Sequence, residues 1–539
     1  MTDDTGEHSP REPDSSRSPE GKSIARAAGS ISAATFLSRV LGFVRDVFIA
    51  RLFGAALLTD AFFVAFAIPS MFRRLLTEGA LTSAFIPVYS DVRAQQGERS
   101  ARLFSGAMTV SLTALLAGVC LLGIYFAHPL VVALAPGFAG SAEKLDLTAR
   151  LTQIMFPFLF FIGLSAIAVG VLNSARRFFL PALAPVVQNL VMIAALVVAG
   201  GLVEANAAVK WLAWGVVAGG ALQLLIQLPL ISKLGISPIP VLPWRAPSVG
   251  RCLALMGPAA FGMAILQINV LIDRWLASFL AEGSISYLYY ANRLVQFPHG
   301  ILSLAVAAAA FPLLADREAR GRHGKEGGSA RSPLDEAGRL TLFITLPAAF
   351  GLIALARPIM EVLFERGAFV AADSSASAAA LRAYALGLVF FGFVRLMAAA
   401  YHSRLDTKTP VRCANWAVLA NVAGSVALMF PLGFVGLALA TTLASALNAW
   451  LLLAGLRETE DWPGGDLART AKHLLPVSAA MGAGLYLFNW VFWPAGADIW
   501  VRAGVLSLEV IGGTAAYLLV SWLVMPDSAA LWRTALRRA

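Results

Sequence analysis

Residues 181–203 read PALAPVVQNLVMIAALVVAGGLV, a run that contains no charged side chain. A helix of about twenty apolar residues crosses the roughly 30 Å hydrocarbon layer of a bilayer. Comparable runs recur from Ile24 to Met525, and 58% of the 539 residues are hydrophobic whereas 14% are charged. Short alternating strands of the kind that form membrane barrels are not seen. The sequence therefore predicts an all-α polytopic membrane protein.

The apolar runs give about fourteen candidate spans. They begin near residues 24, 58, 104, 148, 181, 209, 252, 284, 338, 376, 411, 432, 472 and 500. An even number of spans places both termini on one side of the membrane, so the connecting loops fall into two alternating sets.

Positive charge is concentrated in one of these two sets of loops. Arg93, Arg176, Lys233 and Lys408 stand in that set, whereas the loop over residues 493–498 carries no Lys or Arg. Short cytoplasmic loops retain Lys and Arg, so the basic loops and both termini are predicted to be cytoplasmic. Because the net charge of +10 is spread over loops and forms no single patch, no nucleic acid partner is expected.

An internal repeat organises the spans. Residues 84–91 (AFIPVYSD) match residues 309–316 (AAFPLLAD) at an offset of 225, and Ser174 to Pro181 has the spacing of Ser403 to Pro410 at an offset of 229. Duplication of a six-helix unit would produce such offsets. Six is even, so the two copies keep one orientation and are related by a pseudo-two-fold axis along the membrane normal.

The repeat divides the chain into two lobes and an addition. The prediction is a disordered cytoplasmic tail (1–22), an N-lobe of helices 1–6 (23–235), a C-lobe of helices 7–12 (250–456), two additional helices 13 and 14 (470–526) and a basic cytoplasmic tail (527–539). Transporters with this symmetry bind their substrate near the midplane between the repeats.

Several charged residues lie inside predicted spans, where an Arg or Asp costs about 2.5–3.5 kcal/mol unless it has a partner or an aqueous cavity. They are Arg39, Arg45, Asp46, Asp60, Arg73, Arg74, Glu78, Asp273, Arg274 and Arg293. A guanidinium group can hold two phosphate oxygens at once, and positive charge exceeds negative charge in the first two spans together with Arg293. This excess favours an anionic substrate, although each arginine could instead snorkel or neutralise a carboxylate.

Three stretches resemble one family of transporters. They are residues 38–46 (SRVLGFVRD), 59–66 (TDAFFVAF) and 72–80 (FRRLLTEGA), with further matches at 289–294 (YYANRL) and 407–410 (TKTP). These stretches are similar to the MurJ (MviN) lipid II flippases of the MOP exporter superfamily. The resemblance covers the chain after residue 23.

The resemblance implies two six-helix lobes around a central cavity, a groove for the polyprenyl tail formed by the two extra helices, and alternating access. The implied partners are lipid II, an undecaprenyl-pyrophosphate-linked muropeptide, and membrane lipid in a bacterial inner membrane; no protein partner is implied. Substrate-binding positions would be Arg39, Arg45, Arg73 and Arg293. A cavity charge network would comprise Asp46, Asp60, Arg74 and Glu78.

Some members of this family carry a sodium site. The matching positions are Asp273, Asn421, Ser425 and Thr441, and Ser425 stands where those members have a second carboxylate. Since only Asp273 offers a charge to a cation, the sequence argues against an ion site, and no cofactor is expected.

Other functions remain open from the sequence. A related exporter of drugs or of another polyprenyl-linked sugar would share the architecture, although a drug/cation antiporter should need carboxylates more than arginines. A membrane-embedded enzyme acting on the same lipids is disfavoured, since the chain has no extended soluble domain and no convincing acidic metal-binding pair in a loop. A non-transporting scaffold would tolerate loss of the arginines.

Overall fold

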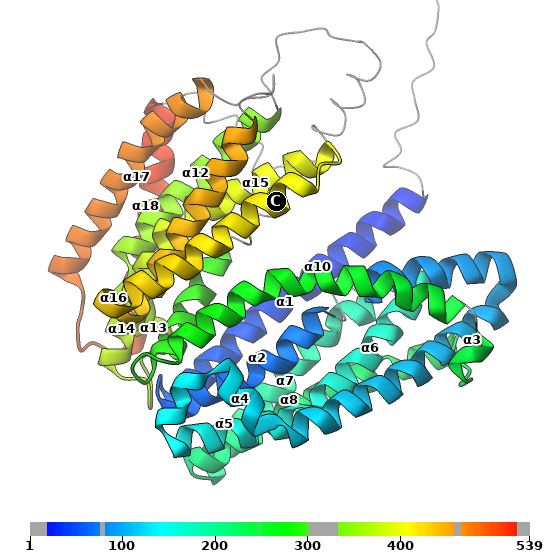
Figure 1. The fold of residues 1–539 in the computed structure, drawn as a ribbon. Helices are drawn as coiled ribbons and strands as arrows, with labels where there is room; N and C mark the ends of the chain where they lie inside the picture. Colours follow the sequence, from blue (N-terminus) through cyan, green and yellow to red (C-terminus); the bar gives the residue numbers. More distant parts are fainter. Residues whose placement is uncertain are drawn as a thin grey trace, which may run out of the picture. The chain divides into compact units, whose positions relative to one another are not determined.

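The structure, a computed structural model, describes residues 19–75, 81–246, 248–298, 300, 333–456 and 465–524. All regular elements within these ranges are helices, in agreement with the all-α prediction (Figure 1). Those of the first half are α1 (Pro19–Phe53), α2 (Leu57–Arg73), α3 (Leu81–Tyr125), α4 (Ala127–Leu134), η3 (Pro136–Gly140), α5 (Ala142–Met155), α6 (Pro157–Ser174), α7 (Phe179–Leu202), α8 (Ala205–Leu225) and α9 (Leu228–Lys233).

The second half continues in the same style. Its elements are η4 (Pro243–Arg245), α10 (Ser248–Ala277), a helix over residues 284–298, α12 (Pro333–Ala354), α13 (Ala356–Phe364), α14 (Ala371–Leu386), α15 (Leu388–Ser403), α16 (Lys408–Leu456), α17 (Gly465–Phe492) and α18 (Ile499–Val524). Residues 84–91 of the first repeat motif lie in α3, whereas residues 309–316 fall outside the described residues.

The start of helix α1 overlaps the predicted N-terminal tail (1–22). Helix α1 begins at Pro19, three residues before residue 22, where the tail is predicted to end. Proline is tolerated in the first turn of a helix, where its missing N–H has no intrahelical partner to lose. The residues that follow it, Glu20 and Lys22, are also good helix formers, so the helix extends beyond the apolar run.

The described helices also bear on the number of membrane spans. Eight helices of the described residues are long and apolar enough to cross a membrane, or nine if the bent pair α14–α15 forms one span. One of the eight, α16, is interrupted at Gly433, whose backbone leaves the helical region (φ 57°, ψ −136°) close to the predicted start of a new span at 432. The count of fourteen stays a prediction.

The repeat is visible in the helix boundaries. Helices α4, α5 and α7 begin at 127, 142 and 179, and α13, α14 and α16 begin 229 residues later, at 356, 371 and 408. The turns after Ser174 and Ser403 also agree in detail. Arg176 and Leu405, again 229 apart, are the non-glycine residues of the described chain with positive φ (57° and 61°).

Hydrogen bonding at these two turns is the same as well. The backbone N–H of Arg177 donates to Leu172 O at 2.9 Å, and that of Asp406 donates to Tyr401 O at 3.0 Å. Both bonds close the end of a helix over a left-handed residue, which is the Schellman arrangement. The repeat predicted from the Ser-to-Pro spacing is therefore confirmed at this turn.

Packing divides the chain into two compact units, which do not follow the predicted lobe boundaries. Unit 1 comprises residues 1–45, 68–125 and 153–264; unit 2 comprises residues 46–67, 126–152 and 265–539. Unit 2 thus contains the end of α1, the start of α2 and the α4–α5 region together with the second half of the sequence. The lobes themselves stay a prediction.

Each unit is held together by close helix contacts. In unit 1, α7 packs along α8, and a Cβ added at Gly215 of α8 would lie 2.8 Å from the Ala195 Cβ of α7, so glycine permits this approach. In unit 2, α12 lies beside α17 (Figure 1). The buried side chains of Leu346, Leu474 and Tyr517 join α12, α17 and α18 in one cluster. The two additional helices are therefore packed onto the second repeat.

Candidate functional site

The predicted site residues are distributed over both units. Arg39, Arg45, Arg73 and Arg74 belong to unit 1, whereas Asp46, Asp60 and Arg293 belong to unit 2. Glu78 lies outside the described residues. Each group is described within its own unit.

In unit 2, Asp46 and Arg293 form a buried ion pair. The Arg293 Nε lies 3.0 Å from Asp46 Oδ2, and the Asp46 side chain is fully buried. The Tyr289 hydroxyl donates to Asp46 Oδ1 at 3.2 Å, and the Tyr289 ring stacks on Phe63 with 3.8 Å between ring centroids. Asp46 comes from the first predicted lobe and Arg293 from the second, so the pair joins segments of both.

Asp60 accepts four hydrogen bonds and is almost completely buried. Its Oδ2 accepts from Lys144 Nζ at 2.8 Å and from the backbone N–H of Gly283 at 2.8 Å. Its Oδ1 accepts from the backbone N–H and the hydroxyl of Ser286, at 3.0 and 2.6 Å. The carboxylate therefore caps the start of the helix over residues 284–298, where unpaired N–H groups and the helix dipole favour a negative charge.

A second carboxylate, that of Glu282, caps the start of α2. Glu282 Oε1 accepts the backbone N–H of Leu57 at 2.7 Å, at the start of α2. Leu57 and Glu282 are separated by 225 residues, the offset of the repeat motif, and Asp60 and Ser286 by 226. Two equivalent helix starts can contact each other in this way only next to the pseudo-two-fold axis. We call Asp60, Lys144, Glu282, Gly283 and Ser286 the capping cluster.

In unit 1, Arg45 is held by a side chain of α7. Its Nη1 donates to Asn189 Oδ1 at 3.1 Å, and Asn189 Nδ2 donates to the backbone oxygen of Ser38 at 3.1 Å. Arg39 is exposed on α1, and Arg73 and Arg74 are half-buried at the end of α2. The amide of Asn189 thus orients one guanidinium group while the Arg39 side chain remains accessible.

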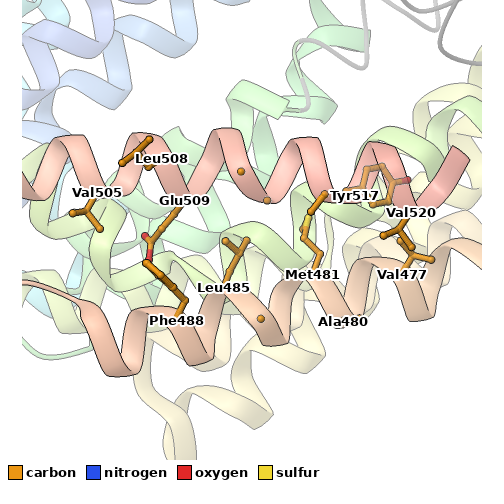
Figure 2. Close-up of a pocket in the computed structure, with 14 residues that line it drawn as sticks. Val477, Ala480, Met481, Leu485, Phe488, Val505, Leu508, Glu509, Tyr517 and Val520 are labelled. Atoms are coloured by element: carbon orange, nitrogen blue, oxygen red, sulfur yellow. The ribbon is translucent and has the colours of Figure 1, made fainter. Parts of the chain in front are cut away.

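Helices α17 and α18 enclose a groove between them (Figure 2). The groove has a volume of about 590 Å³ and is lined by apolar side chains such as Met481, Leu485 and Val520. One carboxylate, that of Glu509, also lines it and accepts from Asn489 Nδ2 at 3.3 and 3.5 Å. A groove is present where the resemblance predicted one, and its ligand stays a prediction.

Comparison with known proteins decides the family. The family model described as lipid II flippase MurJ matches residues 49–499. A Burkholderia cenocepacia protein named lipid II flippase MurJ is 34% identical over 92% of this chain and 95% of its own length. A Rhizobium tropici protein named probable lipid II flippase MurJ is 36% identical, covering 94% of this chain and 96% of the relative.

The chain belongs to the MurJ family of lipid II flippases. A solved structure of a MurJ protein, described as an inward closed conformation, superposes with a TM-score of 0.76 at 28% identity and covers 93% of this chain and 99% of its own. A multidrug resistance MATE transporter of the MOP superfamily reaches a TM-score of 0.60 at 13% identity, covering 83% of this chain and 99% of its own, which shows the shared fold. The chain is accordingly a multi-pass bacterial membrane protein of a transporter family.

The four positions matched to the sodium site of some MurJ proteins do not form an oxygen cage. Asn421 Nδ2 donates to Asp273 Oδ1 at 2.8 Å, so the amide presents its NH₂ group and not its oxygen to the carboxylate. The Thr441 hydroxyl donates to Leu437 O at 3.1 Å, and the fully buried Ser425 supplies no charge. A hard cation needs several converging oxygen ligands. These residues do not fit the ion, and the absence of a cofactor stays an expectation.

Several residues that contact the predicted site residues or cap their helices escaped the sequence analysis. Lys144, Glu282, Ser286 and Asn189 were not singled out, although each makes a contact described above. Two signals were available in the sequence: Asn189 interrupts an apolar run, and Lys144 stands near the start of a predicted span. Polar residues within membrane spans usually face a partner inside the protein.

Proposed function

We propose that this chain moves lipid II, the polyprenyl-diphosphate-linked muropeptide, from the cytoplasmic to the periplasmic leaflet of the bacterial inner membrane, with both termini in the cytoplasm. The observation that carries the proposal is the match to the MurJ family over residues 49–499. Two relatives whose alignments cover more than 90% of this chain are named lipid II flippase MurJ and probable lipid II flippase MurJ.

The substrate-binding residues are proposed to be Arg39, Arg45, Arg73 and Arg293. Their guanidinium groups suit a diphosphate, because each can donate to two oxygens of one phosphate. In the absence of substrate Arg293 is neutralised by Asp46, so an arriving diphosphate competes with this carboxylate for it. A substrate that binds released Arg293 more strongly than Arg293 paired with Asp46 would shift the conformational equilibrium toward the released state.

The capping cluster is proposed to close the periplasmic end while the head group is loaded. It contains one buried ion pair and the capped starts of two helices, and all of its members lie in unit 2. Opening would break these bonds together, and water or a rearranged side chain would have to satisfy the freed groups. Alternating access then requires that substrate binding offset this cost.

Depletion of the native protein and complementation by variants tests the substrate role. Arg45→Ala and Arg293→Ala are expected to abolish growth and lipid II export, because each removes a cation that faces the diphosphate. Arg469→Ala, which removes an exposed arginine paired with Asp466 at the start of α17, is the matched control and should grow normally. Normal export with Arg45→Ala and Arg293→Ala would contradict the proposal.

A further inference from the structure

One arginine of unit 2 is buried without a complete set of partners. Arg502 lies in the first turn of α18, and 17% of its side chain is exposed. Its Nε is buried and has no hydrogen-bond partner among the described residues. Its Nη1 lies 3.8 Å from Glu365 Oε1, which is long for an ion pair. A buried guanidinium donor without an acceptor requires an explanation.

Two more arginines stand close to Arg502. Arg366 directly follows Glu365, and the backbone N–H of Ala368 donates to Arg51 O at 2.9 Å, which holds this loop against the end of α1. The pKa of the Arg366 guanidinium is lowered by burial and then by the positive charges of Arg51 and Arg502. A Cβ added at Gly367 would lie 3.1 Å from Arg51 Cγ, and Glu365 Oε1 lies 3.8 Å from Arg502 Nη1, so this loop brings the three cations together. We call Arg51, Arg366 and Arg502 the arginine cluster.

Two carboxylates near the arginine cluster have other partners. Glu361 is already satisfied, since Arg357 Nε lies 2.7 Å from one of its oxygens and Trp493 Nε1 donates to the other at 2.8 Å. Glu365 Oε1 lies 3.8 Å from Arg502 Nη1, and its Oε2 accepts the Ser374 hydroxyl at 2.6 Å. The three guanidinium groups of the arginine cluster and the Glu365 carboxylate together carry two net positive charges. A diphosphate esterified at both ends carries two negative charges.

The arginine cluster lies at one end of the α17–α18 groove. Arg502, Glu509 and Gly513 are spaced i, i+7 and i+11 and share one face of α18, and the last two line the groove (Figure 2). Leu506 packs in one cluster with Val362 of α13 and Leu485 of α17, so α13 and its loop adjoin the same end. An apolar groove that ends at a cationic cluster matches an apolar chain with an anionic head.

Glu509 adds a constraint on where a head group can stop. Its buried carboxyl group lies two turns along α18 from Arg502, in a groove whose lining includes no cation, so an anion that entered the groove would gain no charged partner there. Asn489 Nδ2 of α17 donates to this carboxyl group at 3.3 and 3.5 Å, which holds it against α17. The head group would then remain at the mouth, beside Arg502.

We infer that Arg51, Arg366 and Arg502 bind the diphosphate of the polyprenyl-linked substrate at the predicted periplasmic end of unit 2, with its apolar chain in the α17–α18 groove. This inference rests on the proposed function and adds a second anion site to the cavity arginines. The site would hold the lipid after the head group has crossed and before it leaves. An adjacent apolar groove keeps the chain bound while the head group is transferred.

Native mass spectrometry of the purified full-length protein with undecaprenyl diphosphate tests the site. We expect Arg366→Gln/Arg502→Gln to weaken binding by about tenfold or more, since two charge-assisted contacts are lost. Arg469→Gln, at the other end of α17, should bind as the unchanged protein does. The same comparison is repeated in protein that also carries Arg45→Ala. This change lowers binding of undecaprenyl diphosphate at the proposed cavity site, so that binding at the arginine cluster can be compared.

Two further arms make the result decisive. Phosphatidylglycerol distinguishes the sources of phosphate: loss of phosphatidylglycerol binding alone would identify a phospholipid site and overturn the inference. Undiminished undecaprenyl diphosphate binding by the double variant would also overturn it. If the double variant unfolds, Arg366→Gln alone decides, because this side chain is only partly covered and its replacement leaves no buried gap. If the double variant binds undecaprenyl diphosphate normally while Arg45→Ala loses lipid II export, the arginine-cluster inference is wrong and the proposed function stands.

Discussion

At the residue scale, the Asp46–Arg293 pair must be separated into a structural and a substrate-binding part. Removing only Arg293 takes the ion-pair partner from a fully buried carboxylate, which costs about 3–5 kcal/mol. Asp46→Asn/Arg293→Gln replaces both charges by amides. We expect this double variant to unfold near the temperature of the unchanged protein, whereas Arg293→Gln alone unfolds much earlier.

The same double variant should still fail to support growth in the depletion assay, because no cation remains at this position. Asp46→Asn alone is the control, since it keeps Arg293 and removes the competing carboxylate. Normal growth of the double variant would show that Arg293 acts only by neutralising Asp46.

Asp60 and Lys144 are expected to be energetically coupled. Asp60→Asn leaves the Lys144 ammonium group, which is 10% exposed, without its carboxylate. Adding Lys144→Gln removes the uncompensated charge, so the double variant should lose less stability than the two single variants together. Thermal unfolding in a double-mutant cycle should give a coupling of about 1–3 kcal/mol. Additive losses would show that the pair contributes nothing beyond its separate residues.

The sequence identified the acidic members of these pairs but not all of their partners. Asp46 and Asp60 stood out because a charge within an apolar run needs compensation. Lys144 and Ser286 lie 84 and 226 residues from Asp60, and only the folded chain brings them together. Arg293 stood out for the same reason and through the motif that resembles a family, yet its pairing with Asp46 could not be derived from spacing.

At the element scale, apolar runs located helices well but said little about how long helices are divided. The predicted third span began near 104, whereas α3 begins at Leu81 and is interrupted at Gly97 (φ 84°, ψ 172°). Polar residues between Gly97 and 104 continue the helix although they lower its hydropathy. Hydropathy measures burial in lipid, and helix continuation beyond the membrane depends on backbone conformation and capping.

Filling the α17–α18 groove should impair transport without unfolding the protein. Gly512 lines the groove, and a Cβ added there meets no atom within 4 Å, so Gly512→Leu places its side chain in open space. We expect this variant to lower lipid II export several-fold by displacing the apolar chain of the substrate. Export would be measured in depleted cells that express the variant at the level of the unchanged protein.

Gly504→Leu is the control for this change. Gly504 is on the same helix and also meets nothing within 4 Å, but it does not line the groove. Replacing a helical glycine by leucine favours the helix by a similar amount at both positions. Equal export by the two variants would show that the groove is not used by the substrate.

At the scale of the whole molecule, the two packing units cross the predicted lobes for a physical reason. The capping cluster and the Asp46–Arg293 pair join residues 46–67 and 126–152 to the second half of the chain. The repeat could be predicted from similar motifs, because duplication preserves spacing. Which helix starts contact each other depends on the conformation of the transporter, and a repeat in the sequence carries no such information.

The orientation of the whole molecule rests on loop charge and can be measured with two cysteines. Gln95 and Ala495 are both exposed, and they lie in loops predicted to be cytoplasmic and periplasmic. The native Cys120, Cys252 and Cys413 are buried, so they should react little with a thiol reagent. In intact spheroplasts, a membrane-impermeant maleimide should label Ala495→Cys at once and Gln95→Cys only after permeabilisation. Because short loops that retain Lys and Arg stay in the cytoplasm, the reverse pattern would invert every span and place the arginine cluster on the loading side.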